Sequence, residues 1–347
     1  MAQVYENADF TISALDALSS RSGFLLDRAQ NEAEVATISP HERIFIRPKS
    51  RRFRQLFKEC PLSDRAWTFQ EHFLSTALLH FSTHETFWEC RTYVYSESGD
   101  CLNVDPFTKS LMDIKTLDSF EPHFIWRVIV NDYSRRTLTF ASDKLPALAG
   151  LAENLSGHTK CDYLAGLWKN SLTEGLLWQA LGQVERVRNP EQYRAPSWSW
   201  AALDGKIGYD SNMSISSRVP QTGDLQILEA HTELVGQSEF GSVRGGYLKV
   251  LGSFRRENRD KFGTRDNLDN KIAISGFRTY RYLRVATYKA PGELKEHPER
   301  YCTCYLLLER WKDNQSYQRI GYAELWSDHQ LCTEHVDSEE ILEAVIV

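Results

Sequence analysis

The sequence predicts an α+β protein in which a mixed N-terminal part and a helical middle precede a β-rich C-terminal region. A helix followed by a hairpin is predicted between residues 61 and 91, and apolar residues recur at helical spacing between 145 and 181. After Tyr193 the chain changes to short aromatic and β-branched segments that are separated by polar loops. These changes predict three parts, which are residues 1–95, 96–190 and 191–347.

The composition is that of an ordinary globular protein. A chain of 347 residues suffices for about two domains, and its 12% aromatic content can bury a large core. The 41 basic and 47 acidic residues give a net charge of −6, which offers no basic excess for nucleic acid. No apolar run approaches the about 18 residues of a membrane span, and no secretory signal is recognisable. The seven cysteines are scattered, so we expect reduced thiols, buried at Cys302 and Cys304, and a cytoplasmic location.

Helices and short strands are expected to alternate in the N-terminal part. Apolar residues before Asp16 recur at helical spacing, which predicts a helix, or a helix that runs into a short strand at Phe10–Ile12. Alternation in His41–Pro48 predicts a half-buried strand. Ser63 or Asp64 can cap the next helix, because a short side-chain oxygen accepts hydrogen bonds from the N–H groups of the first turn.

The following hairpin is expected to consist of strands at Leu78–Phe81 and Thr86–Cys90. Alternation along the second strand puts Trp88 and Cys90 on one face and Phe87, Glu89 and Arg91 on the other. We expect Glu89 and Arg91 to form an ordinary pair on their shared face of the sheet.

The middle of the chain is expected to be helical and the C-terminal region to consist of strands. A structured block starts at Phe124–Asn131, and the periodicity of 145–155 and 163–181 predicts two helices separated at Gly157-His158. Four later segments have the residue types of strands, and these are Leu225–Glu229, Gly246–Leu251, Tyr301–Glu309 and Arg319–Trp326.

Neither a metal nor a cofactor is expected. Glycine-rich phosphate loops, a G-x-S-x-G elbow and H-E-x-x-H are all absent from the sequence. His80 and His84 are four residues apart but lie on a strand and its turn, so they do not share a helix face. His72 is expected to make a favourable charge interaction at the C-terminal end of its helix.

The segment Arg65–Glu71 (RAWTFQE) combines an aromatic residue with polar ones on one helix face. Trp67, Gln70 and Glu71 lie at positions i, i+3 and i+4. They could form the wall of a pocket in which Glu71 acts as an acid, a base or a hydroxyl acceptor. They could equally be a hydrogen-bonded group that ties the helix to the strands, and we favour this interpretation.

The segment Tyr193–Ala201 (YRAPSWSWA) carries two tryptophans. Pro196 disfavours a helix at Ala195, and Trp198 and Trp200 alternate with serines as on one face of a strand. Such a pair could be the floor of a ligand site, but an anchor in the core is more common.

Together these motifs resemble the fungal heterokaryon incompatibility (HET) family. RAWTFQE is similar to its R-G-W-T-x-Q-E, the hairpin LLHFSTHETFWECRT to its vlhF…l.WeC, and YRAPSWSWAALDG to its R-x-P-S-W-S-W-A-S-x-D-G. The N-terminal MAQVYENADFTISAL also resembles the family, so the likeness runs to about residue 210. The upstream strands of the family are absent, so the resemblance implies that 1–95 is the C-terminal half of the domain. It further implies a remnant of a TIR-like α/β core, a fold linked to death signalling and sometimes to NAD cleavage.

Two functions are compatible with this resemblance. The first is an intracellular recognition or signalling protein with a protein partner and without nucleotide chemistry. The second is a cofactor-independent cyclase or isomerase of fungal specialised metabolism, including pericyclic (Diels-Alder-type) catalysis, that folds a hydrophobic substrate in an aromatic pocket. In that enzyme Gln70 and Glu71 would be catalytic. The substrate would be bound by Arg65, Trp67, Trp88, Trp198 and Trp200.

Overall fold

The computed structural model describes residues 1–25, 33–39, 42–46, 53–103, 122–182, 185–186, 193–210, 217–256, 267–268, 280–289, 301–313, 315–327 and 339–347. The chain divides into two compact units, Met1–Phe120 and Glu121–Val347, which we call unit 1 and unit 2. The three-part division from the sequence stays a prediction. Within the described ranges, no helix has both the length and the apolar character that crossing a membrane requires.

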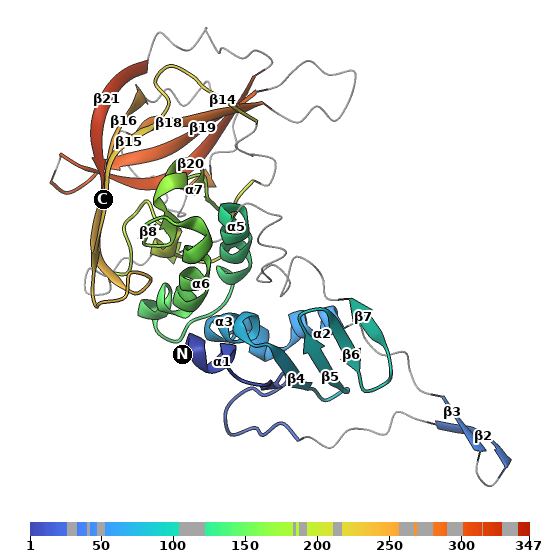
Figure 1. Ribbon diagram of the computed structural model, residues 1–347. Helices are drawn as coiled ribbons and strands as arrows, with labels where there is room; N and C mark the ends of the chain where they lie inside the picture. Colours follow the sequence, from blue (N-terminus) through green and yellow to red (C-terminus); the bar gives the residue numbers. More distant parts are fainter. Residues whose placement is uncertain are drawn as a thin grey trace. The chain divides into compact units, whose positions relative to one another are not determined.

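Unit 1 is built on a sheet of five strands in the order β1-β4-β5-β6-β7 (Figure 1). The central hairpin is the predicted one, because β4 and β5 pair antiparallel with Leu79 opposite Trp88. Phe87 and Glu89 are buried and Trp88 is exposed, which confirms the alternation expected for β5. The strands are β1 (Thr11–Ala14), β4 (Ala77–Phe81), β5 (Thr86–Cys90), β6 (Tyr93–Ser96) and β7 (Cys101–Asn103).

Short helices accompany this sheet. The predicted cap of α3 is wrong, since the helix starts after Arg65 without a side-chain cap. The Ser63 hydroxyl instead donates to the Cys60 carbonyl at 2.8 Å, inside the preceding 3₁₀ turn, and is not available to the helix. A further hairpin joins β2 (Ala33–Ser39) to β3 (Glu42–Ile46), which lies inside the predicted strand. The helices are α1 (Ala2–Glu6), α2 (Phe53–Glu59), the 3₁₀ turn η1 (Pro61–Asp64) and α3 (Ala66–Leu74).

The chain is a mixed α/β protein with a β-rich C-terminal region, as expected. In the described part of unit 1, β1 and β4 are the parallel pair of the five-stranded sheet, and the pairings from β4 to β7 are antiparallel. A doubly wound core needs several parallel strands with crossover helices. The TIR-like interpretation therefore stays a prediction.

Unit 2 contains a sheet that closes on itself. Its order is β14-β18-β19-β20-β21-β16-β15, and an additional pairing of β16 with β18 closes five of these strands into a barrel. The four predicted strands are present as β15, β16, β19 and β20, and β18 and β21 are additional. The strands are β14 (Arg218–Val219), β15 (Gln226–Leu234), β16 (Val243–Arg256), β17 (Asn267–Leu268), β18 (Tyr280–Lys289), β19 (Tyr301–Arg310), β20 (Tyr317–Ser327) and β21 (Glu339–Ile346).

Strand β19 is enclosed on both faces. All residues from Tyr301 to Leu308 are buried, so both the barrel interior and the opposite face are covered by protein. Cys302 and Cys304 are free, buried thiols two positions apart, which confirms the expectation for this pair.

The helical middle is only partly as predicted. Helices α5 (Pro122–Tyr133) and α6 (Ala149–Thr159) are present, but Gly157 and His158 lie inside α6 rather than between two helices. The helix predicted over 163–181 is wrong. Its place is taken by the small strands β8 (Tyr163–Leu164), β9 (Leu167–Trp168) and β10 (Gln179–Ala180), the last paired with β13 (Ile207–Gly208), and by the one-turn helix α7 (Leu172–Gly175).

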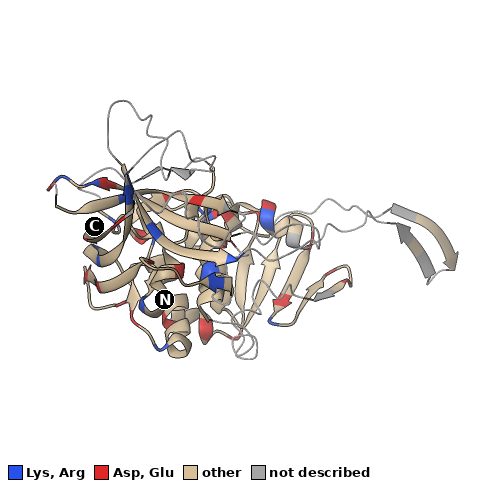
Figure 2. Cartoon of the chain, turned by 90° about the horizontal axis from the view of Figure 1, so that it is seen from above, with Lys and Arg blue, Asp and Glu red and all other residues tan. Residues whose placement is uncertain are grey.

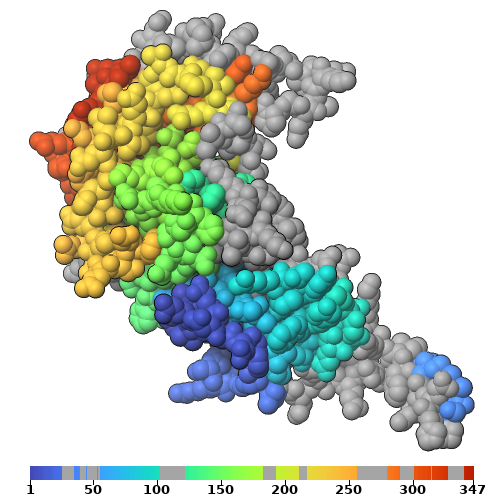
Figure 3. Space-filling model, viewed as in Figure 1, coloured from blue at the N-terminus to red at the C-terminus, as the bar shows by residue number. Residues whose placement is uncertain are grey.

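The turn between β8 and β9 explains why this segment does not form a helix. Ala165 and Gly166 have φ values of 46° and 98°, which the right-handed helix excludes. A Cβ atom at Gly166 would lie 2.7 Å from Nε1 of Trp200, so only glycine fits. Most leucines and tryptophans of the segment are buried in unit 2, and green residues lie beside yellow ones in Figure 3.

The double-tryptophan segment is not the predicted strand. Trp200 starts the 3₁₀ turn η7 (Trp200–Ala202), which Ser199 caps by accepting from the Ala201 N–H. Both tryptophans are 0% exposed. The Trp200 indole donates to the Gly166 carbonyl at 2.9 Å, and the Trp198 carbonyl accepts from the Trp178 indole at 3.0 Å.

A buried arginine joins the barrel to this aromatic core. Arg319 of β20 is fully buried, and its guanidinium lies 3.3 Å from the centre of the Trp178 ring. It donates to the carbonyls of Leu176 and Trp178, and its backbone N–H donates to the Ser197 hydroxyl. The charge is thus compensated by carbonyl dipoles and by the face of an aromatic ring.

We predict that Trp198→Ala destabilises unit 2 by about 3–5 kcal/mol, because it leaves a large cavity in a close-packed core. Urea denaturation measures the change. Trp88→Ala, at a position that is 38% exposed, is the control and should cost less than about 1 kcal/mol. A similarly small effect of Trp198→Ala would indicate an open site around this ring instead of a core.

Candidate functional site

Buried charges identify where the chain holds unusual chemistry, because a buried charge is costly unless it is paired. Basic and acidic residues are interspersed over the elements in the view of Figure 2. Among the described residues, Glu89 is the most buried carboxylate, at 2% exposure. Lys144 is the most buried lysine among these residues, at 1% exposure.

The predicted face of α3 is present, and it contacts α1. Gln70 is buried, Trp67 and Glu71 are half-buried and Arg65 is exposed. Glu71 accepts a hydrogen bond from the Tyr5 hydroxyl. Burial and the neighbouring Glu71 charge raise the pKa of Tyr5 to about 12. This contact ties α3 to α1, whereas the structural role that we favoured ties the helix to the strands; the role of Glu71 stays a prediction.

The other predicted site residues lie in different places. Trp88 is on the exposed face of β5, where its ring centre lies 6.0 Å from that of Phe10. Trp198 and Trp200 belong to the core of unit 2, whereas Trp67 and Trp88 belong to unit 1. The pocket that would combine these four tryptophans stays a prediction.

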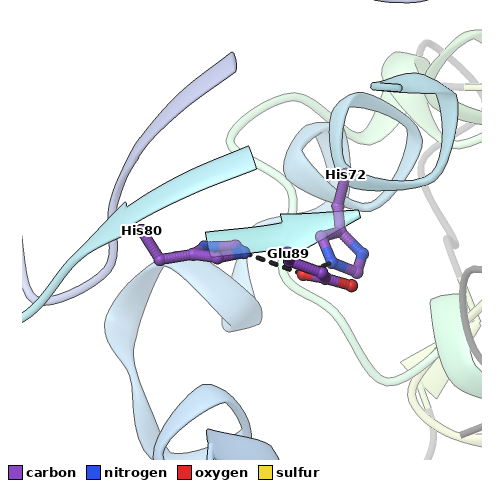
Figure 4. A group of neighbouring side chains, drawn as sticks. All are labelled: His72, His80 and Glu89. Carbon is purple, nitrogen blue, oxygen red and sulfur yellow. Dashed lines mark hydrogen bonds and ion pairs between the residues drawn. The ribbon is translucent and has the colours of Figure 1, made fainter. Parts of the chain in front are cut away.

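A cluster of three polar side chains lies inside unit 1, and we call it the His–Glu–His cluster. It consists of His72 of α3, His80 of β4 and Glu89 of β5 (Figure 4). Nε2 of each histidine lies 2.8 Å from the same atom, Oε2 of Glu89. The side chains of His80 and Glu89 are 0% and 3% exposed, and that of His72 is 11% exposed.

The local fold brings these residues together. In the β4–β5 register, His80 lies opposite Phe87 and Leu78 opposite Glu89, so His80 and Glu89 are diagonal neighbours on one face of the hairpin. His72 is in the last turn of α3, and the Leu74-Ser75 corner turns the chain toward β4. The helix end therefore lies over the hairpin that follows it.

Aromatic rings surround the cluster. Phe53 lies 5.0 Å from His80 and Phe57 lies 4.8 Å from His72, measured between ring centres, and Phe73 packs edge-on against His72. These rings exclude water and lower the local dielectric, which strengthens each charge interaction inside.

The histidines keep the buried carboxylate ionised. Burial by itself raises the pKa of Glu89, but the charge and hydrogen bonds of His72 and His80 outweigh burial and hold that pKa well below its usual range. An ionised carboxylate can only accept hydrogen bonds, so both Nε2 atoms carry a hydrogen in this arrangement.

The sequence did not predict this cluster. Glu89 was expected to pair with Arg91, but Arg91 is exposed and Glu89 is bound to the two histidines. His72 was expected to interact with the helix end alone. The contact between His80 and Glu89 could have been predicted from the hairpin, because both side chains point inward from it.

Two imidazoles and one carboxylate are also a set of metal ligands. One ligand atom from each of the three lies within 4.8 Å of the others. The sequence led us to expect no metal, and the spacing of 72, 80 and 89 in the chain gives no hint of one.

Residues 1–71 match the family model described as heterokaryon incompatibility protein (HET). We call these residues the HET segment. The HET segment comprises α1, β1 and the following elements up to Glu71 of α3, so it ends one residue before His72. The comparisons with curated proteins and with solved structures give no match. The similarity of the hairpin and of the double-tryptophan segment to the HET family stays a prediction.

Unit 2 holds two buried basic residues, Lys144 and Arg194, beside the exposed carboxylate of Asp204. Asp204 Oδ1 accepts from the Arg194 guanidinium at 2.8 Å and lies 3.9 Å from Nζ of Lys144. The Lys144 carbonyl accepts from the Tyr133 hydroxyl at 2.7 Å. Burial, and secondly the positive charge of Arg194, lower the pKa of Lys144 to about 8. This lysine therefore loses its proton at a lower pH than an ordinary lysine does.

We predict that Glu89→Gln loosens unit 1, because an amide oxygen cannot replace a charged acceptor for both histidines. The expected loss of local stability is about 2–4 kcal/mol. It is measured as faster hydrogen exchange of the β4 and β5 amides. Glu59→Gln, the same change at an exposed position of α2, is the control and should leave this exchange unchanged. Unchanged exchange in Glu89→Gln would show that the carboxylate charge does not hold the cluster.

We predict that unit 2 becomes more stable, relative to Lys144→Met, as the pH rises from 8 toward 10. Folded Lys144 loses its proton near pH 8, whereas the unfolded side chain keeps it until about 10.4. The unfolded state thus binds more protons in this window, and stability rises with pH by roughly 3 kcal/mol in all. Urea denaturation at several pH values measures the difference. Lys206→Met, at an exposed position, should show no such trend, and a flat difference for Lys144→Met would contradict the prediction.

Proposed function

We propose that this chain is a fungal recognition or signalling protein of the heterokaryon incompatibility type, which acts through a protein partner and has no nucleotide chemistry of its own. The observation that carries the proposal is the HET-family match of residues 1–71. The proposal does not depend on a TIR-like fold. The sheet of unit 1 is mostly antiparallel, whereas a doubly wound core has several parallel strands.

The exposed face of the unit 1 sheet supports a protein partner. Ile12, Leu79, Trp88 and Tyr95 are aligned across four neighbouring strands by the pairing register. Ile12 is 53% exposed, Trp88 38% and Tyr95 46%. Exposed apolar residues that form a continuous row, with aromatic rings among them, are typical of protein interaction surfaces.

The alternative, a cofactor-independent cyclase or isomerase, requires a pocket lined by the predicted tryptophans. A cavity of about 570 Å³ lies at Arg218–Gln226 in unit 2, and none of the predicted site residues lines it. Trp198 and Trp200 are enclosed by protein. No observation specifically favours the enzyme. Glu71→Gln tests for this activity, because the substitution would abolish turnover in such an enzyme.

We predict that regulated expression of the full chain in a filamentous fungus reduces viability without lowering cellular NAD. Trp88→Ser should restore growth because it removes the largest ring of the exposed row, and viability and NAD are both measured after induction. Trp326→Ser is the control, because it removes a similarly exposed tryptophan from unit 2. A fall in NAD would contradict the absence of nucleotide chemistry. Loss of the effect in Glu71→Gln at an unchanged melting temperature would favour the enzyme.

A further inference from the structure

We propose that the His–Glu–His cluster of unit 1 is a binding site for one divalent transition metal ion, and that Zn²⁺ is the ion it takes. The ligands are Nε2 of His72, Nε2 of His80 and a carboxylate oxygen of Glu89. Neither the HET-family match nor the proposed function requires this site.

The donor set favours zinc. Imidazole nitrogen and carboxylate oxygen are both zinc ligands, and two histidines with one glutamate form the protein part of several zinc centres. Hard cations such as Mg²⁺ and Ca²⁺ prefer oxygen ligands alone, so two imidazoles disfavour them.

The distances are close to those of a zinc site. Each Nε2 lies 2.8 Å from Oε2 of Glu89. Ligand atoms around a tetrahedral zinc ion are separated by about 3.4 Å, given bonds of about 2.0–2.1 Å. The two nitrogen–oxygen separations therefore need to grow by roughly 0.6 Å, which small side-chain rotations supply. Binding also requires each Nε2 to lose its hydrogen, and a neutral imidazole does this by moving the hydrogen to Nδ1.

The enclosure distinguishes zinc from iron. Non-haem iron(II) in a site of two histidines and one carboxylate keeps several open coordination positions for oxygen and substrate. In this cluster Phe53, Phe57 and Phe73 lie against the imidazoles, and His72 has the most exposed side chain of the three, at 11%. That geometry leaves access from the side of His72, which suits the single open position of a four-coordinate ion.

The test is a metal titration of the full chain after removal of metals with EDTA. We expect one Co²⁺ per chain with the visible absorption of four-coordinate cobalt, and we expect Zn²⁺ to displace it. His72→Asn should weaken Zn²⁺ binding by more than about 100-fold, because it removes a direct ligand. His72 is chosen because it is the least buried of the three. His84→Asn, at an exposed position of the adjoining turn, is the matched control and should bind as the wild type does.

X-ray absorption of the zinc-loaded wild type provides a measurement that does not depend on any variant. We expect only nitrogen and oxygen neighbours, at about 2.0–2.1 Å, with the signature of two imidazoles. Sulfur at about 2.3 Å would assign the ion to free cysteines such as Cys101 or Cys161 and would overturn the proposal. No binding, or equal binding by His72→Asn and His84→Asn, would overturn it as well and leave the cluster as a hydrogen-bonded group.

Discussion

The carboxylate of Glu89 imposes the main constraint on unit 1. Its charge is enclosed by the sheet and by phenylalanine rings, so the fold must bring donors to it from elsewhere in the chain. One donor, His80, comes from the neighbouring strand and the other, His72, comes from the end of α3. The position of α3 over the hairpin, and the path of the chain between them, are therefore tied to one buried charge.

Unit 2 meets a comparable requirement with aromatic rings and carbonyl groups. The carbonyl of Gly166 accepts from the indoles of Trp126 and Trp200, and Arg319 lies on the face of Trp178. The indole N–H groups of Trp126, Trp178 and Trp200 thus each have a carbonyl partner inside an apolar enclosure. The high tryptophan content of the chain serves the core of this unit.

The His–Glu–His cluster and the buried tryptophans of unit 2 both follow the HET segment in the chain. The HET segment supplies α1, β1, α2 and most of α3, whereas His72, His80 and Glu89 follow it in the chain. Phe53 and Phe57, which enclose the cluster, do belong to the HET segment. The cluster therefore depends on the HET segment for its surroundings and on the next hairpin for two of its three polar groups.

Local pattern was sufficient for the β4–β5 hairpin and for four strands of the large sheet of unit 2, because each has a clear periodicity and a polar boundary. It was also sufficient to place Trp88 and Glu89 on opposite faces of β5, since alternation is a local property of a strand. Periodicity failed over 163–181, where leucines and tryptophans are buried on every side and the left-handed turn at Ala165-Gly166 breaks the helix. Only the tertiary structure decided that Glu89 meets His72 and His80 rather than Arg91, because that choice depends on strand register and on where a helix ends, and neither is encoded in the spacing of the three residues.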